Sequence, residues 1–440
     1  MRSVMEYEKL GELIRCYRNR ENKTQQDFAK EAGIDHDSVI AIEKGEIPLE
    51  HAVLKSLLAV LHIPMAEIVA YLVTEEVSTE LWLSLLEASL PSQDRRLCED
   101  IVVHVLACCD EDCEDLLLRL YQMVQQWKGS IELRIELLDN VISYARLRDL
   151  QSLVAKGLFY RYLVERDDFG RMEETFKSGQ SVLHYVELLP CDDRVVFYYK
   201  LGVHAYNLRW FNDTITYCKK SIIEDKDRSV YRGYSTLLIC SSYYYLDQCE
   251  ESEKYLKIFS NMDYPFVQEN VDFLTAKLHE RKGNTEIAIS LLLQCLNTCS
   301  YKMNIVNSLL EVYYFKNDSS SAIQLLQREH EYLNLKYTNP ISIKGHAYYF
   351  INKGKWMHRW GKNSEAIDCY IQSVSMFVEL TEADEALLRK MELTRLSMIN
   401  AAKTGQNLTD ASVVQLSQEL DIYIVEIQKK GILKSSLLRD

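Results

Sequence analysis

The sequence predicts an all-α protein in which a small helical domain precedes a long array of helix pairs. The chain of 440 residues contains only 15 Gly and 6 Pro, the residue types that most disfavour helices. Apolar residues recur at helical spacing along most of the chain. After about residue 95, small and aromatic residues return at similar places in successive helix pairs, which is the pattern of a repeat protein.

Composition limits the partners that we expect. The formal net charge is −14, which argues against unspecific coating of nucleic acid or of an anionic membrane but permits a confined basic site. No apolar run approaches the roughly 18 residues of a membrane helix. We therefore expect a cytoplasmic protein with no membrane partner.

The 12 cysteines do not form a metal or disulfide pattern. The closest group is Cys108, Cys109 and Cys113, which lacks a CxxC pair and has acidic residues between its members. We expect most of these cysteines to be small apolar residues of the core. We expect neither a metal site nor another cofactor.

The first helix is predicted from about Leu10 to Arg20, after a frayed start at residues 1–8. Thr24 then caps a short helix that Gly33 ends, and Asp35 caps the next one, which stops near Gly45. Two short helices joined by a tight turn are a helix-turn-helix. The side chains expected in its core are Phe28, Ala29, Ala32, Val39 and Ile42.

Two further helices complete this domain over residues 1–72, one over about 48–61 and one from Pro64. Residues 73–94 are predicted to be a linker with a connector helix. Leu81, Trp82, Leu85 and Leu86 line one side of that helix. This apolar side either packs on a neighbouring domain or forms a dimer contact.

Residues 95–400 are predicted to be a TPR-like α-solenoid. A small residue recurs at Thr214, Ser252, Ala288, Ala322 and Ala366, at intervals of 38, 36, 34 and 44 residues. In the clearest unit, residues 347–374, Gly354, Gly361 and Tyr370 stand where a tetratricopeptide repeat needs them. A poorer unit covers residues 153–179. A helix near 410–430, within a terminal segment 401–440, is expected to cap the array or to form a dimer surface.

Helix pairs of this kind stack into a superhelix whose first helices supply a concave wall suited to extended peptides. Asn side chains on such a wall can grip a peptide backbone, Tyr supplies apolar area, and Lys or Arg can take a carboxylate. The candidate peptide-binding residues are Tyr199, Asn207, Tyr244, Asn270, Lys277, Arg281, Asn304, Asn307, Tyr314, Lys355 and Arg359. Any one of them alone is more often an ordinary solvated helix residue, and the signal lies in the group.

Residues 10–68 resemble an Xre/Cro-type helix-turn-helix domain, through Leu10-Gly11, Thr24-Gln25, Ala29 and Ile42-Glu43-Lys44-Gly45. The layout of the chain resembles the peptide-sensing Rgg/PlcR/NprR/PrgX (RRNPP) family. The resemblance implies that the second helix of the helix-turn-helix, the one capped by Asp35, reads DNA. It also implies that Asn residues hold a peptide, which favours Asn207, Asn270 and Asn307 among the candidate peptide-binding residues. The candidate DNA-binding residues that it implies are Thr24, Gln25, His36, Asp37, Ser38, Ala41 and Lys44.

Charge complicates the expectation of DNA binding. Residues 1–70 hold nine basic and twelve acidic residues, a net charge of −3, whereas DNA affinity depends on neutralising phosphates. A local basic strip could still form from Arg15, Arg18, Arg20, Lys23, Lys30 and Lys44. The alternative is a helix-turn-helix kept for protein contacts.

No enzyme motif is present: the chain lacks a P-loop, a GxSxG elbow, an HExxH pair and a dinucleotide fingerprint. We therefore expect a non-enzyme. The leading hypothesis is a homodimeric transcription regulator whose binding to a double-stranded DNA operator is controlled by a short signalling peptide. Such a regulator would fit either quorum sensing or the lysis–lysogeny decision of a phage. The alternative is a TPR interaction adaptor, or a Rap-like regulator of a signalling protein.

Overall fold

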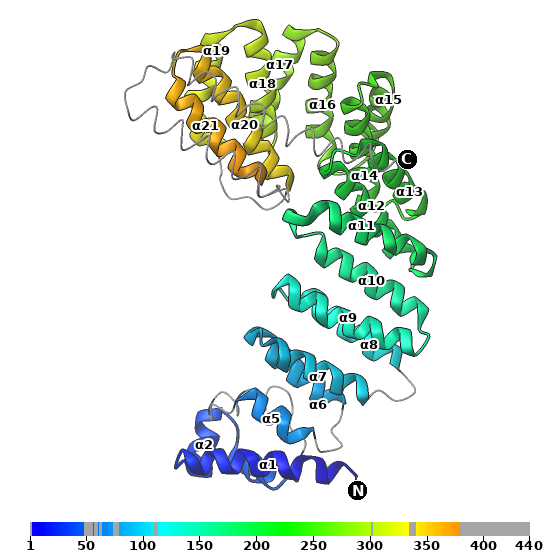
Figure 1. The fold of residues 1–440 in the computed structure, drawn as a ribbon, viewed down its shortest axis with the longest axis vertical. Helices are drawn as coiled ribbons and strands as arrows, with labels where there is room; N and C mark the ends of the chain where they lie inside the picture. Colours follow the sequence, from blue (N-terminus) through cyan, green and yellow to red (C-terminus); the bar gives the residue numbers. More distant parts are fainter. Residues whose placement is uncertain are drawn as a thin grey trace. The chain divides into compact units, whose positions relative to one another are not determined.

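The computed structural model describes residues 2–47, 56, 60, 64–73, 79–108, 113–300, 302–333 and 340–378. Within these ranges every regular element is an α-helix or a short 3₁₀ helix, and there is no strand (Figure 1). The chain divides into two compact units, Met1–Glu165 and Arg166–Asp440. None of the helices in the described ranges combines the length and apolar character needed to cross a bilayer. The all-α prediction is confirmed.

The first unit begins with α1 (Arg2–Arg20), α2 (Gln25–Ala32), α3 (His36–Glu43) and α5 (Met65–Leu72). The expected frayed start is wrong, because α1 already begins at Arg2 in a segment free of Pro and Gly. The helix predicted over 48–61 lies outside the described residues apart from Ser56 and Val60.

The remainder of this unit contains α6 (Thr79–Ser89), α7 (Arg95–Ala107), α8 (Cys113–Gln126), α9 (Ile131–Leu147) and α10 (Gln151–Glu165). Helix α6 packs on α7, with Leu81, Trp82, Leu85 and Leu86 all buried. The Trp82 ring stacks on His104 of α7 at 4.9 Å between centroids. The apolar side of the predicted connector helix is therefore used for packing within the unit.

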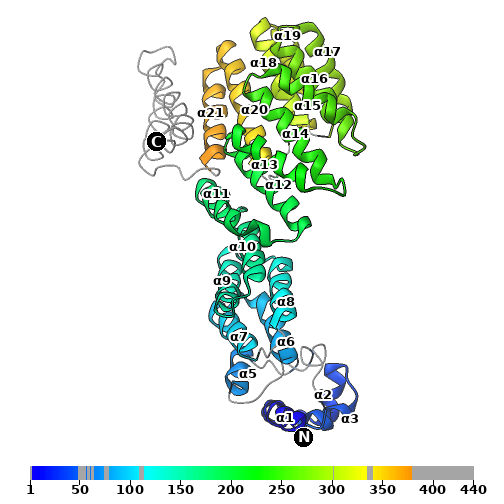
Figure 2. The same cartoon turned by 90° about the vertical axis from the view of Figure 1, so that its right-hand side faces the viewer.

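The second unit begins with a short 3₁₀ helix (Phe169–Arg171), α11 (Met172–Ser181) and a 3₁₀ segment (Val182–Leu188), and continues with five helix pairs (Figure 2). The pairs are α12 (Cys191–Asn207) with α13 (Phe211–Glu224), α14 (Val230–Tyr245) with α15 (Cys249–Ser260), α16 (Val267–Arg281) with α17 (Thr285–Thr298), α18 (Lys302–Lys316) with α19 (Ser319–Gln327), and α20 (Pro340–Arg359) with α21 (Asn363–Val378). The predicted poorer unit 153–179 spans the boundary between the two compact units.

The small residue predicted to recur occupies the fourth position of the second helix in all five pairs. Its burial is complete or nearly so at each place, with exposure of 0% at Thr214, Ser252, Ala288 and Ala322 and 2% at Ala366. Five residues earlier, the turn within each pair adopts a left-handed backbone: Arg209, Asp247, Gly283, Asn317 and Gly361 have φ of 63°, 62°, 81°, 57° and 75°. The repeat register read from the sequence therefore matches the helix pairs.

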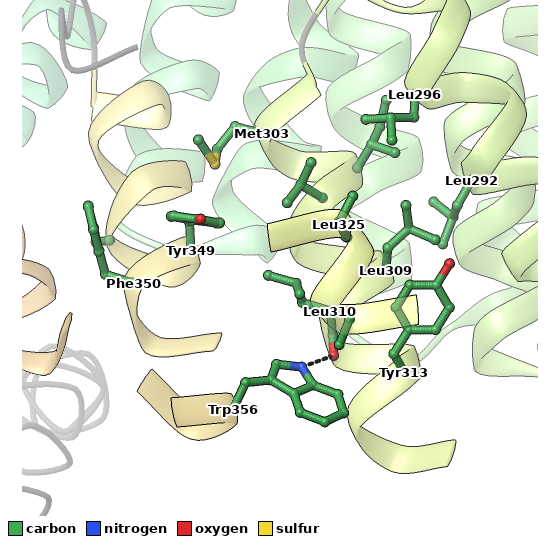
Figure 3. Packing of buried hydrophobic residues seen from close by; sticks show 14 of the residues in the cluster. Leu292, Leu296, Met303, Leu309, Leu310, Tyr313, Leu325, Tyr349, Phe350 and Trp356 are labelled. Carbon is green, nitrogen blue, oxygen red and sulfur yellow. Dashed lines mark hydrogen bonds between the residues drawn. The ribbon is translucent and has the colours of Figure 1, made fainter. Parts of the chain in front are cut away.

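A large core of this unit is formed mainly by residues of α16 to α21. Figure 3 shows Leu292, Leu309, Leu310 and Leu325 packed with Tyr313, Tyr349 and Trp356. The Trp356 indole Nε1 donates a 3.2 Å hydrogen bond to the carbonyl oxygen of Leu310 (Figure 3). This bond satisfies a polar atom that burial of the ring would otherwise leave without a partner.

Most of the described cysteines are buried, as predicted. Cys98, Cys113, Cys218, Cys240, Cys295, Cys299 and Cys369 are buried, and all described cysteines are free thiols. Burial raises the pKa of Cys218 to about 12 and that of Cys240 to about 11. The predicted helix at 410–430 and the segment 401–440 lie outside the described residues.

Candidate functional site

The helix-turn-helix is built by the local signals expected from its sequence. The Thr24 hydroxyl accepts a hydrogen bond from the Asp27 N–H at the start of α2, and the Asp35 carboxylate accepts one from the Ser38 N–H at the start of α3. Gly33, with φ of 69°, ends α2 in the left-handed conformation. Phe28, Ala29, Ala32, Val39 and Ile42 are buried, as predicted.

Gly11 allows α1 to approach α3. A Cβ atom at this position would lie 2.2 Å from the carbonyl oxygen of Ile42, closer than any side chain can come. Gly11, which carried part of the resemblance, therefore has a packing reason. This contact fixes the end of α3 against the body of the domain.

The candidate reading face of α3 is exposed to different degrees. The Asp37 side chain is 99% exposed and that of His36 is 45% exposed. Ala41 is half-buried, and the Ser38 hydroxyl donates to the Asp35 carboxylate of the helix cap. Lys44 is exposed beside Glu46, with 3.8 Å between its Nζ and the carboxylate. Asp37 is thus the most prominent charge on this face.

Gln25, a candidate for DNA contact, is engaged inside the domain. Its Nε2 donates a 2.7 Å hydrogen bond to Glu43, whose carboxylate also receives Arg18 Nε at 2.5 Å and Arg18 Nη2 at 2.9 Å. Arg18 and Glu43 are both buried. This three-residue network joins α1, α2 and α3, and sequence spacing alone did not reveal it.

The expected basic strip is largely paired with neighbouring residues. Lys23 lies between Glu21 and Glu31, at 2.8 and 2.7 Å, and Arg15 lies 3.7 Å from Glu12. Arg20 covers the ring of Tyr17 at 5.0 Å, and Arg18 is buried. Lys30 and Lys44 are exposed. Phosphate contacts of this domain would therefore rely on few cations.

In the second unit, several candidate peptide-binding residues form cation–aromatic contacts. The Arg281 guanidinium covers the Tyr244 ring at 4.7 Å, and Lys277 lies 5.8 Å from the same ring. Further along, Arg359 covers Tyr314 at 3.5 Å and donates to the Tyr314 carbonyl oxygen at 2.7 Å. Tyr199 packs instead against the rings of Tyr231 and Tyr234 on the next pair.

The asparagines singled out by the resemblance have different surroundings. Asn307 is buried, its Nδ2 donates to the Gly345 carbonyl oxygen at 2.7 Å, and its Oδ1 accepts from Asn352 at 3.5 Å. The Nδ2 of Asn270 donates to the Phe266 carbonyl oxygen at 2.7 Å. Asn207 is buried and its Oδ1 has no hydrogen-bond partner in the described structure. Asn207 therefore has the free acceptor that a ligand could use.

The remaining candidates lie on the same first helices. Asn304 is half-buried on α18, where its Oδ1 would be 3.2 Å from a Cβ placed at Gly345. Lys355 is exposed on α20. The structure thus brings Tyr244, Lys277 and Arg281 together, and Tyr314 with Arg359, as two separate groups.

Three residues that the sequence did not single out lie beside these candidates. Arg209 Nη1 donates to the Tyr348 hydroxyl at 3.1 Å, and Lys344 Nζ donates to the carbonyl oxygen of Asn207. Tyr245 is 47% exposed, yet its pKa is raised by desolvation, with Lys277, Arg209 and Tyr348 close enough to influence it. One sequence signal could have drawn attention to Arg209. It lies five residues before Thr214, at the turn position where the other four pairs have Asp, Gly, Asn and Gly.

Two protein families match parts of the chain. Residues 14–68 match the helix-turn-helix family, so the chain carries a domain of this kind near its start. Residues 387–429 match the family described as Spo0E like sporulation regulatory protein. No curated protein matches the chain.

Three solved structures to which the chain is similar are a tetratricopeptide repeat protein, a Rap protein and PlcR. A tetratricopeptide repeat protein from Parabacteroides merdae is 13% identical, with 61% of this chain and 94% of that chain covered and a TM-score of 0.47. A Rap protein complexed with competence and sporulation factor is 11% identical, with coverage of 80% and 99% and a TM-score of 0.44. PlcR of Bacillus thuringiensis, in complex with the peptide PapR7 and DNA, is 15% identical, with coverage of 64% and 99% and a TM-score of 0.26.

Proposed function

We propose that this protein is a DNA-binding transcription regulator whose operator binding is controlled by a short peptide held by the helix pairs of the second unit. The observation that carries the proposal is the match of residues 14–68 to the helix-turn-helix family, together with the exposed His36 and Asp37 side chains at the start of α3. In a helix-turn-helix, the second helix enters the major groove of DNA. His36, Asp37, Ser38 and Ala41 are the residues proposed to meet base edges.

Peptide control is proposed from the residues of the first helices in the second unit. Tyr244, Lys277 and Arg281 combine aromatic surface with positive charge, and Asn207 offers an unpaired acceptor. An extended peptide needs both apolar area and polar partners for its backbone and its carboxylates. These residues supply both.

Coupling between the two functions is proposed to pass through a homodimer. Two half-sites of an operator require two reading helices at a fixed spacing. A peptide that favours one arrangement of the dimer changes DNA affinity by its differential affinity for the two arrangements. The protein would carry out this function in the cytoplasm, where both ligands can meet it.

The test is selection of bound fragments from sheared host DNA by the full-length protein at two salt concentrations. We expect one palindromic site to be enriched, with binding that weakens steeply as salt rises. A variant with His36→Ala, Asp37→Ala and Lys44→Ala should lose the enrichment. Lys362→Met, at an exposed lysine of the α20–α21 turn, is the matched control. Enrichment that survives the triple substitution would contradict the proposal.

A second candidate function is favoured by the match of residues 387–429 to a sporulation regulatory protein. In this case the chain regulates a signalling protein, and the helix-turn-helix serves protein contacts. The two candidates separate in the host. A regulatory effect that survives the triple substitution on α3 but disappears when residues 387–429 are deleted supports the second candidate, and the opposite pattern supports the first.

A further inference from the structure

The turn that follows α12 contacts the first part of α20, 139 residues further along the chain in the case of Arg209 and Tyr348. Arg209 Nη1 donates to the Tyr348 hydroxyl at 3.1 Å. Lys344, one helical turn before Tyr348, donates from Nζ to the carbonyl oxygen of Asn207. Two cations from the first and the fifth helix pair of the unit are thereby brought together.

Neither cation has a carboxylate partner among the described residues. Lys344 and Arg209 form no ion pair there, whereas the other cations nearby do: Lys277 lies 2.6 Å from Glu280, and Arg281 lies 3.6 Å from Asp247. The pKa of Lys344 is lowered to about 8, first by burial and then by the positive charge of Arg209. Lys344 is half-buried beside the exposed Arg209. A half-buried cation next to a like charge and without a counter-ion is unfavourable, and an anion placed between the two would offset that cost.

Asn207 adds a polar atom that needs a partner. The residue is 7% exposed, and its Oδ1 accepts no hydrogen bond in the described structure. Its own carbonyl oxygen already receives Lys344. An unsatisfied buried acceptor costs about 1–3 kcal/mol, so a ligand N–H in this place would be favourable.

The backbone of Arg209 gives a further reason to regard this residue as functional. The corresponding turn residues of the other four pairs are Asp247, Gly283, Asn317 and Gly361, types that tolerate a left-handed backbone. Arg209 adopts the same conformation, with φ of 63°, although it has a Cβ atom, unlike Gly, and lacks the short polar side chain by which Asn and Asp bond locally to the backbone. Residues held in sparsely populated backbone conformations cluster at ligand-binding and active sites.

We propose that Arg209 and Lys344 bind a carboxylate group of the peptide ligand, while Asn207 Oδ1 accepts a hydrogen bond from an N–H of the same ligand. This inference rests on the proposed peptide-receptor function. A charge-assisted hydrogen bond is stronger than a neutral one, and two cations allow the carboxylate to be held at both oxygens. A peptide terminus carries a carboxylate next to an amide N–H, so the C-terminal carboxylate is the source to which we commit.

The first experiment tests the site without any peptide. The lysines of the full-length protein are acetylated with an amine-reactive reagent, either in succinate or in neutral succinamide at matched ionic strength. The labelled lysines are then mapped by mass spectrometry. We expect succinate to protect Lys344 and to leave Lys362 unaffected, and Arg209→Gly to abolish the protection. Gly suits the left-handed turn, so this variant removes the cation without harming the backbone. Equal labelling of Lys344 in both solutions would overturn the carboxylate site.

The second experiment identifies the source of the carboxylate. Three libraries of random short peptides are passed over the protein: one with free C-termini and no Asp or Glu, one amidated and without acids, and one amidated with Asp and Glu. We expect the free-terminus library to be retained about tenfold to a hundredfold more strongly than the neutral amidated one, the range for one charge-assisted hydrogen bond. Lys344→Met should remove this preference, and Lys362→Met should keep it.

The outcomes separate the two proposals. Preference for the acidic amidated library would overturn the C-terminal assignment in favour of a side-chain carboxylate. Retention of all three libraries to the same degree would overturn the carboxylate site and leave the peptide receptor standing. Retention of no library, with succinate protection of Lys344 intact, would overturn the peptide receptor and leave an anion site.

Discussion

At the scale of single residues, the buried ion pair between Arg18 and Glu43 holds the helix-turn-helix together. Replacing Arg18 with Met would leave the Glu43 carboxylate buried, with the Gln25 amide as its remaining side-chain donor among the described residues. Breaking such a pair by removing one partner costs about 3–5 kcal/mol. We expect amide hydrogen exchange in α1–α3 to accelerate strongly in this variant.

The matched control for this prediction is Arg15→Met. Arg15 lies 3.7 Å from Glu12, with both side chains about half exposed. Exposed pairs contribute about 0–1 kcal/mol, so exchange in α1–α3 should be nearly unchanged. Equal exchange rates in the two variants would show that the buried pair does not stabilise the domain.

His204 makes the stability of the second unit depend on pH. The side chain is 2% exposed, and its Nε2 lies 2.8 Å from the carbonyl oxygen of Met172. Burial, together with the charge of Arg166, lowers the pKa of His204 to about 4. Because the folded pKa lies below the unfolded one, the stability from neutral His204 is present above about pH 6.5 and is lost as pH falls toward 4.

The loss over this pH window amounts to about 3 kcal/mol, and His204→Gln should remove it. Thermal unfolding of the wild type and the variant at pH 7 and pH 4.5 gives the comparison. Other acids titrate in both proteins, so the difference between their pH dependences is the quantity to measure. His358→Gln, at an exposed histidine, should behave as the wild type. A pH dependence unchanged by His204→Gln would contradict the assignment.

At the scale of helices, the small residue of each pair sets how closely its two helices approach. Ala288 is fully buried at the fourth position of α17, whereas the preceding Ile287 is 49% exposed. Ala288→Leu should destabilise the second unit by about 1–3 kcal/mol, since extra volume cannot be accommodated in a packed core. Ile287→Leu should be nearly neutral. Urea unfolding followed by circular dichroism measures both, and equal midpoints would disprove the packing role.

The same helix pairs show what can be predicted from sequence. The recurring small residue was found because its neighbours in the chain repeat with it, from Thr214 to Ala366. Local capping signals at Thr24 and Asp35 were equally readable, since each acts within three residues. Contacts between distant segments carry no such pattern, and this is why Arg209–Tyr348 and Gln25–Glu43 were missed.

Asn307 illustrates the same limit for the candidate site. Its residue type and position matched a peptide-gripping role, but a side chain that is 8% exposed and bonded to Gly345 and Asn352 stabilises the contact between α18 and α20. Sequence spacing gives the helix on which a residue lies, and not whether its hydrogen-bonding capacity is already used. Asn207 differs from Asn307 because its buried Oδ1 accepts no hydrogen bond in the described structure.

At the scale of the whole molecule, the proposal requires that DNA and peptide affect each other's binding. If the peptide changes the affinity for the operator by some factor, the operator must change the affinity for the peptide by the same factor, because both describe one thermodynamic cycle. Coupling between sites is typically worth about 1–3 kcal/mol, a factor of about 5 to 150. We expect the peptide selected from the libraries to shift the Kd of the selected DNA fragment within this range.

Fluorescence anisotropy with labelled DNA gives one factor, and calorimetric titration with the peptide, with and without DNA, gives the other.

Lys344→Met separates two ways in which this coupling can arise. If Lys344 only increases peptide affinity, the variant needs more peptide but reaches the same DNA response at saturation. If Arg209 and Lys344 also fix the arrangement of the first and fifth helix pairs that favours the operator, the response at saturating peptide falls as well. A DNA affinity that saturating peptide leaves unchanged in the wild type would contradict peptide control, because a ligand shifts an equilibrium only by its differential affinity for the two states.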